Sequence, residues 1–242
     1  MKTSIIVLHR YPYGDSSWVV KTLSPDVGVL SLLVKGAKSK NSPFKTAIDP
    51  LVHSELELRY KSGNSLLFPK EVCLRDYYPK MRTRLQDLAT AQFFAEVLLR
   101  LGTNESYAAE EFLWFRGVLE TLELNGANEK SMSVWLQKLC EILGYAPVIL
   151  TCGLCGRDLT DAPADIWFSH GGAVCHNCLD NKKTSYSKDF LSELHQFACG
   201  KSELPATAYS RIENFFLRHL RTHTGALENL RSWEWLQETR GL

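Results

Sequence analysis

The chain has 242 residues, 45% of them hydrophobic and 23% charged, with a formal net charge of +1. These proportions are ordinary for a soluble globular protein, and the length allows one large domain or two to three small ones. No segment reaches the roughly 18 apolar residues of a membrane span, and the apolar run at residues 5–8 is too short for a secretion signal. Together with an odd number of cysteines, seven, this predicts a cytoplasmic protein.

Positive charge is concentrated at the start of the chain. Residues 1–80 contain twelve Lys and Arg and seven Asp and Glu, a balance of +5, whereas the rest contains sixteen and twenty, a balance of −4. The two balances add to the total of +1. A basic first part joined to a mildly acidic remainder indicates an anionic ligand for the first part.

Short apolar runs separated by turn residues occupy residues 1–80. Val52, Leu56 and Leu58 alternate with polar residues, a pattern typical of a half-buried antiparallel strand. Pro25 and Gly28 mark a tight turn between two other runs. Five strands without a helix favour a small barrel of the oligonucleotide-binding (OB) type over residues 1–80. The predicted strands are residues 4–10, 18–23, 28–34, 51–60 and 65–68.

A basic segment, residues 34–45, lies within this predicted barrel. It carries Lys35, Lys38, Lys40 and Lys45 without one acidic residue, and its Gly, Ser, Asn and Pro residues predict a mobile loop. Lysines on such a loop are able to follow a phosphate backbone without reading base sequence. A solvated loop without a ligand explains the charge equally well. Aromatic residues nearby are available for base stacking, although each fits a core position better: Tyr11, Tyr13, Trp18 and Phe44.

Beyond residue 80 the hydrophobic periodicity becomes helical. Leu85, Leu88 and Leu99 share one helical face, and glycines at 102 and 144 are suited to end helices. These signals predict a helical domain made of residues 81–150 and 180–242. Its predicted helices are residues 81–101, 106–124, 131–143, 187–198 and 207–221, followed by a tail that docks on the core through Trp233, Trp235 and Leu236.

The last of these predicted helices ends in a group of basic residues. Arg211, Arg218, His219 and Arg221 are expected on its outer face. Positive charge of this kind is typical of a helix C-terminus, where it complements the helix dipole. A second basic patch is the alternative interpretation.

Two Cys-x-x-Cys pairs, Cys152 with Cys155 and Cys175 with Cys178, lie within residues 151–179. Their spacing is typical of a four-cysteine zinc site, because two intervening residues let both sulfurs of a pair face one ion. Two disulfides would need an oxidising compartment, and unrelated thiols would rarely form matched pairs. A full set of protein ligands predicts one structural Zn²⁺ rather than a catalytic one, with His170 and His176 as bystanders.

The other three cysteines stand apart from this motif. Cys73, Cys140 and Cys199 are each surrounded by apolar residues in the sequence. We therefore expect them to be small buried hydrophobic side chains.

The order of these features resembles the bacterial recombination and repair family RecO, and the resemblance extends over essentially the whole chain. Its most specific part is Gly144-Tyr145-Ala146-Pro147 running into the first cysteine pair, followed by the glycines and cysteines of residues 171–178. The family usually has glutamate where Asp15 stands. The other matching segments are Tyr13-Gly14-Asp15, Leu23 to Gly28, Val34-Lys35-Gly36-Ala37, and Leu217 to Leu220 with Leu230-Arg231-Ser232.

The resemblance implies a three-part α+β protein: an OB barrel, a helical bundle and an embedded four-cysteine zinc module. It further implies a nucleoid-associated protein that binds single- and double-stranded DNA and anneals complementary strands. Its implied partners are RecR, in some organisms RecF, and the acidic C-terminal tail of the single-stranded-DNA-binding protein, and together they load RecA onto coated DNA. We expect phosphate contacts from Arg10, Lys21, Lys35, Lys38, Lys40 and Lys45.

Two other classes of function remain open on the residues alone. A nuclease would need clustered carboxylates around open metal positions, and Asp158, Asp161 and Asp165 lack the spacing of an ordered strand or helix. We interpret them as part of a solvated loop, and we expect no catalytic residue. The other alternative is a zinc-containing protein–protein scaffold of a repair complex, in which the lysines only solvate the loop.

Overall fold

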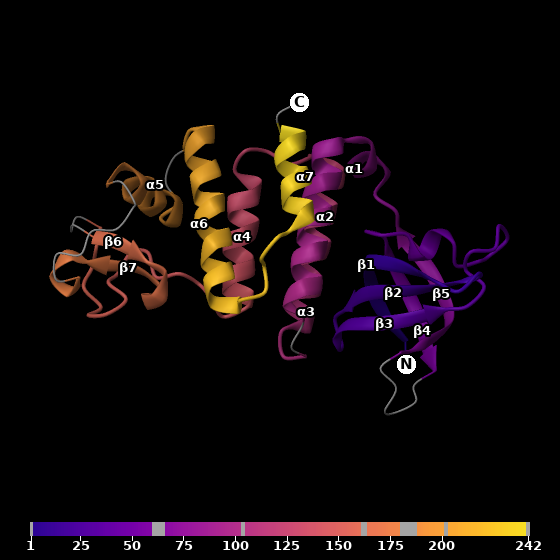
Figure 1. Cartoon of the computed structure of the whole chain (residues 1–242). Helices are drawn as coiled ribbons and strands as arrows, with labels where there is room; N and C mark the ends of the chain where they lie inside the picture. Colours follow the sequence, from indigo (N-terminus) through magenta and orange to yellow (C-terminus); the bar gives the residue numbers. More distant parts are fainter. Residues whose placement is uncertain are drawn as a thin grey trace. The chain divides into compact units, whose positions relative to one another are not determined.

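The computed structural model describes residues 2–59, 66–102, 105–160, 164–179, 188–200 and 203–240 (Figure 1). The chain forms two compact units. Unit 1 comprises Met1–Ala127 and Asn229–Leu242, and unit 2 comprises Asn128–Glu228. None of the described helices combines the length and the apolar character needed to cross a membrane. The boundaries expected for the barrel, helical and zinc domains stay a prediction.

Unit 1 begins with a five-stranded barrel. Its antiparallel strands lie in the order β3-β2-β1-β4-β5. Parallel pairing then closes the barrel, because the Leu33 N–H donates to the Leu67 carbonyl at 2.8 Å and the Leu67 N–H donates to the Ser31 carbonyl at 2.9 Å. This is the OB-like arrangement expected from the sequence. The strands are β1 Lys2–Tyr13, β2 Ser17–Ser24, β3 Gly28–Val34, β4 His53–Arg59 and β5 Phe68–Asp76.

Alternating apolar side chains fill the barrel. Ile5, Val20 and Leu32 are fully buried in this core, and the alternation predicted for β4 is confirmed by buried Val52, Leu56 and Leu58. The fifth strand was predicted wrongly at residues 65–68. It begins at Phe68 and continues through a largely exposed sequence in which charged residues interrupt the apolar ones, so its hydrophobic signal is weak. Tyr60 and Ser65, at the ends of two predicted strands, lie outside the described residues.

In the described part of unit 1, four α-helices accompany the barrel: α1 Pro79–Thr83, α2 Leu85–Leu101, α3 Ala108–Leu124 and α7 Arg231–Arg240. The single helix predicted for residues 81–101 is wrong at Arg84, whose extended backbone separates α1 from α2. The Arg84 guanidinium donates to the Leu122 carbonyl and pairs with Asp87. The contact with Leu122 reaches across unit 1 to α3, so the local sequence around residue 84 contains no signal for the break.

Helix α7 packs against α2 (Figure 1). The Glu96 carboxylate of α2 accepts hydrogen bonds from the Ser232 N–H at 2.9 Å and the Ser232 hydroxyl at 2.6 Å. Trp233 lies 5.2 Å from Phe93, centroid to centroid, and Leu236 is fully buried. The expected docking of the C-terminal segment is thus confirmed, and the segment is helical.

The described residues of unit 2 form three α-helices and a two-stranded sheet. Helix α4 packs against α6, where the Ser133 hydroxyl donates to the Tyr209 carbonyl at 3.1 Å. Phenylalanines of α5 and α6 fill the core beside this contact, including Phe215 and Phe216 at 5.3 Å. The elements are α4 Ser131–Ile142, β6 Ala164–Trp167, β7 Gly172–Cys175, α5 Lys188–Ala198 and α6 Ala206–Thr224.

Two expectations about burial were wrong. His219, expected on the outer face of α6, is buried, and its Nε2 lies 2.9 Å from the Tyr145 carbonyl. Cys73 and Cys199 are exposed, whereas Cys140 is buried as expected. Apolar sequence neighbours did not bury Cys73 or Cys199, and basic neighbours did not expose His219, because burial depends on segments far away in the chain such as that of Tyr145.

Candidate metal centre and nucleic-acid surface

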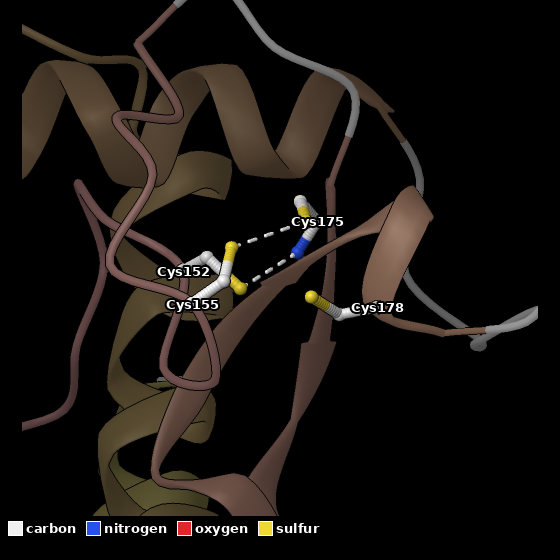
Figure 2. Close-up of side chains that lie close together, drawn as sticks. All are labelled: Cys152, Cys155, Cys175 and Cys178. Carbon is white, nitrogen blue, oxygen red and sulfur yellow. Dashed lines mark hydrogen bonds between the residues drawn. The ribbon is translucent and has the colours of Figure 1, made fainter.

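The four cysteines of the two Cys-x-x-Cys pairs converge in unit 2 (Figure 2). Their sulfur atoms all lie within 4.8 Å of one another, and the Cys155 and Cys175 sulfurs are 3.7 Å apart. Sulfurs about 2.3 Å from a tetrahedral zinc would be about 3.8 Å apart, close to this separation. The cysteines are free thiols, not disulfides. Cys152, Cys155, Cys175 and Cys178 therefore form a group that fits a metal ion.

Backbone hydrogen bonds shape the first knuckle. The Gly156 N–H donates to the Cys152 carbonyl at 2.9 Å, and the Cys152 N–H donates to the Arg157 carbonyl at 2.8 Å. Gly156 closes this turn with φ of +72°, a conformation that favours glycine. The second knuckle follows directly from β7, which ends at Cys175 and continues into a 3₁₀ turn, His176–Cys178.

Close backbone approach explains two glycines beside the knuckles. A Cβ on Gly172 would lie 2.1 Å from the Val148 carbonyl oxygen, because Val148 pairs with β7 at this position. A Cβ on Gly153 would lie 2.6 Å from the His170 carbonyl oxygen. Only a residue without a side chain fits either place, so these glycines bring the two halves of the module together.

The thiols of the cluster differ in acidity. Burial opposes ionisation of Cys152, but N–H donors from Cys175, Cys155 and Leu154 outweigh it and lower its pKa to about 6. Hydrogen bonds with the Cys175 and Cys155 thiols raise the pKa of Cys178 to about 12. If all four sulfurs ionised at such short distances, they would require a cation among them, which is the condition that a bound metal would satisfy.

The nearby histidines and carboxylates engage other groups. His176 Nε2 lies 3.2 Å from the Asp165 carboxylate, and His170 Nδ1 lies 3.0 Å from the Ser169 hydroxyl. The Thr160 N–H donates to the Asp158 carboxylate at 2.7 Å, and Asp161 lies outside the described residues. Within the described ranges, the four cysteines are the one group of His, Cys, Asp and Glu that could hold a metal.

In unit 1, two of the predicted DNA-binding residues lie over the ring of Trp18. The Arg10 guanidinium is 4.7 Å and the Lys38 ammonium 5.3 Å from the centroid of its ring. The Lys38 side chain donates to the Gly14 carbonyl at 2.6 Å, and its N–H donates to the Ser16 carbonyl at 3.0 Å. The basic segment is thus tied to the turn of the β1–β2 hairpin. We call Arg10, Trp18 and Lys38 the Trp18 cluster.

The other predicted contacts divide into two groups. Lys35, Lys40 and Lys45 are exposed on the basic segment, with Lys35 5.3 Å from the Phe68 ring. Lys21 faces the other side of β2, because strand residues alternate and Trp18 and Val20 belong to the core side. Its ammonium donates to the Ser31 hydroxyl at 2.6 Å. The structure brings together Arg10 and Lys38, but it separates Lys21 from them.

The basic segment also differs from a plain loop. It forms consecutive turns, with the Ser39 N–H bonded to the Gly36 carbonyl and the Lys45 N–H bonded to the Ser42 carbonyl. Ala37 is buried, and Phe44 packs against the barrel core. Arg10 forms an ion pair with Asp49 at 2.6 Å. The sequence gives no signal for this partner, since it comes from a turn outside the basic segment.

Family models account for almost the whole chain. A model described as "Recombination protein O N terminal" matches residues 1–78, and one described as "Recombination protein O C terminal" matches residues 82–234. The chain belongs to the RecO family. It therefore has a role in DNA repair and recombination, and the resemblance noted in the sequence is confirmed.

Curated relatives of this RecO chain are named "DNA repair protein RecO". The protein of Rhodopirellula baltica is 27% identical over 213 residues, covering 86% of this chain and 79% of the relative. That of Syntrophotalea carbinolica is 23% identical over 181 residues, 75% of this chain and 70% of the relative. That of Caldanaerobacter subterraneus is 22% identical over 232 residues, 92% of each.

Proposed function

We propose that the chain is a recombination mediator that binds single- and double-stranded DNA and anneals complementary strands without catalysing a covalent step. With RecR, and with RecF where it is present, it would help to load RecA onto DNA coated by single-stranded-DNA-binding protein, whose C-terminal tail it would contact. Membership in the RecO family supports this role. The zinc-containing scaffold without direct DNA contact is the alternative.

The observation that carries the proposal is the Trp18 cluster with the exposed lysines beside it. Arg10 and Lys38 hold positive charge against an aromatic ring, and Lys35, Lys40 and Lys45 continue that charge along the basic segment. Lysines and arginines bind phosphates and release counterions, which gives affinity without base readout. A mediator needs this property, because bases left unread remain free to pair with a second strand.

We propose one Zn²⁺ held by Cys152, Cys155, Cys175 and Cys178, since four soft sulfur donors in this spacing suit zinc. Its role would be structural, because it would fix the two knuckles relative to β7. All four coordination positions would be occupied by protein, which leaves none for a substrate or water.

The test is annealing of two complementary oligonucleotides, coated with single-stranded-DNA-binding protein, at two salt concentrations. The wild type should accelerate annealing, and the acceleration should fall steeply with salt. A Lys35→Glu/Lys38→Glu variant should lose it, and its log–log salt slope for single-stranded binding should flatten by about 1.4, or about 0.7 per phosphate contact. Lys80→Glu/Lys138→Glu, with the same change in net charge at two exposed lysines elsewhere, is the control.

The outcomes separate the two functions. Equal annealing by wild type and the Lys35→Glu/Lys38→Glu variant would show that the basic segment is not part of the DNA-binding surface. Absence of both acceleration and DNA binding at low salt would refute the mediator and favour the scaffold.

A further inference from the structure

A cleft of about 710 Å³ opens within unit 1 between the end of β1, the outer side of α2 and the start of α7. Pockets of about 300–1,000 Å³ are the usual size for small organic ligands, so this one has room for a nucleotide. Its lining residues all belong to unit 1, whereas the cysteines of the metal centre belong to unit 2. None of the six predicted phosphate contacts lines it.

The walls of the cleft present flat rings and apolar side chains. His9 and Tyr11 of β1 lie 4.4 Å apart in an edge-to-face pair, and Tyr11 is 44% exposed. Trp235 of α7 also lines the cleft, with Leu88 and Leu99 of α2. Burial lowers the pKa of His9, with Glu96 opposing, which favours the neutral ring. Such surfaces accept an unstacked base, because every base offers a face for stacking.

The rim of the cleft is positively charged. Arg100 and Arg231 line it, and Arg231 is exposed with no ion pair among the described residues. Glu96 is the one acidic residue of the lining, and its carboxylate already accepts bonds from Ser232 and Arg100. Its negative charge is therefore largely neutralised, and the guanidinium of Arg231 is available for a phosphate.

Strand β1 connects this cleft to the Trp18 cluster. Successive strand residues point to opposite faces, and here Arg10 points toward Trp18 while His9 and Tyr11 line the cleft. In this part of the chain β1 pairs with β2 alone among the described strands, since its pairing with β4 ends at Ile6. The β1–β2 hairpin thus offers a basic surface on one face and an aromatic cleft on the other.

We propose that the cleft is a second nucleic-acid subsite, which takes an unstacked base of single-stranded DNA between Tyr11 and Trp235 and its phosphate at Arg231. The inference rests on the proposed DNA-binding function and adds to it a site that distinguishes single strands from duplexes. Bases inside a duplex are stacked and paired, so they do not enter the cleft. Two DNA surfaces on one hairpin would hold two strands close together, as annealing requires.

An acidic peptide with apolar residues is the competing occupant. The positive charge of Arg231 does not distinguish the peptide from DNA, because a guanidinium would bind a carboxylate as well as a phosphate. Three ring side chains in one lining, the edge-to-face pair of His9 and Tyr11 together with Trp235, favour a flat aromatic ligand. Strand β1 also connects the cleft to the Trp18 cluster, which favours DNA, the polymer that the basic segment would bind.

The test uses the full-length protein with a fluorescein-labelled oligonucleotide, single-stranded or duplex, in anisotropy titrations. A Tyr11→Ala/Arg231→Gln variant should bind the single strand about tenfold more weakly, from the loss of one base stack and one phosphate contact. Its affinity for duplex should change less than twofold. Tyr13→Ala is the matched control, because Tyr13 is 57% exposed on the same hairpin but does not line the cleft. Lys35→Glu/Lys38→Glu should weaken both forms of DNA.

Photocrosslinking of an oligonucleotide that carries 5-iodouracil gives a second readout on the unmodified fold, with adducts expected at Tyr11 or Trp235. Equal single-strand affinity of the cleft variant and the wild type, without such adducts, would overturn the subsite and leave the proposed function standing. Absence of DNA binding by the wild type would overturn both. If the variant kept its affinity for DNA but lost that for an acidic peptide ending in phenylalanine, the cleft would be a peptide site and the proposal wrong.

Discussion

Replacing Glu111 by glutamine should stabilise unit 1 at high pH and have little effect at low pH. Glu111 lies on α3, is 1% exposed, and its Oε2 has no hydrogen-bond partner among the described residues. Burial raises its pKa from 4.5 to about 7. The folded state then binds a proton more tightly than the unfolded chain, so stability is lost as pH rises from 4.5 to 7 and stays constant above. A glutamine has no proton to lose.

The magnitude follows from the shift of the pKa. The pKa of Glu111 rises from about 4.5 in the unfolded chain to about 7 in the folded protein, and each pKa unit corresponds to about 1.4 kcal/mol of unfolding free energy. The full effect is therefore about 3 kcal/mol, of which about 2.5 kcal/mol is lost between pH 5 and pH 8. Urea unfolding of wild type and Glu111→Gln at both pH values measures it. Subtracting the wild type at each pH removes the contribution of other titrating groups. Glu110→Gln, at the exposed neighbour on the same helix, is the control.

The reasoning would be refuted if the stability difference between Glu111→Gln and wild type were the same at both pH values. A variant that became less stable at pH 8 would refute it more strongly. That result would mean that the folded protein provides a donor or a cation to the ionised carboxylate. Burial would then not be the dominant cause of the shift.

Three further predictions concern unit 2. Cys155→Ser should lower the zinc content and solubility of the purified protein. Cys199→Ser, at an exposed thiol outside the cluster, is the control and should change neither. Stoichiometric zinc in Cys155→Ser would show that the ligand assignment is wrong. Gly172→Ala should lower the unfolding temperature far more than Gly200→Ala. Both glycines have positive φ, but only at Gly172 would the added Cβ clash with a backbone oxygen, that of Val148. Equal losses of unfolding temperature would contradict this close approach. Burial and the charge of His223 lower the pKa of His219 to about 4, with the Tyr145 carbonyl opposing. Stability should therefore fall by about 3 kcal/mol between pH 6.5 and pH 4, and urea unfolding of His219→Gln should show a shallower fall than the wild type.

The parts of the fold that depend on local pattern were predictable from the sequence. Alternation identified β4, and the turn at Pro25 separated β2 from β3. The spacing of the cysteine pairs identified the group of four sulfurs that could hold a metal, because two residues between thiols are a short-range geometric requirement. In these cases a few consecutive residues contain the whole physical cause.

The parts that depend on distant partners were not predictable. Arg84 breaks a continuous helical pattern because the Leu122 carbonyl, far along the chain, accepts its hydrogen bond. The sequence predicts an exposed basic residue at His219, but its ring contacts the Tyr145 carbonyl, which lies far away in the chain. The pairing of Arg10 with Asp49 likewise required the barrel to close. His9 and Tyr11 line a cleft only because α7 packs against α2, and no residue spacing in the sequence predicts that packing.

The return of α7 to α2 also fixes the order in which unit 1 is able to mature during synthesis. The barrel and α1 to α3 leave the ribosome first, but the surface of α2 that receives Trp233 and Leu236 stays uncovered until all of unit 2 has been translated. Throughout that interval the nascent chain exposes an apolar strip, which is a binding site for chaperones and a risk for aggregation. Slow codons or a translational pause within unit 2 would prolong this exposure, whereas the same pause within β1 to β5 would not.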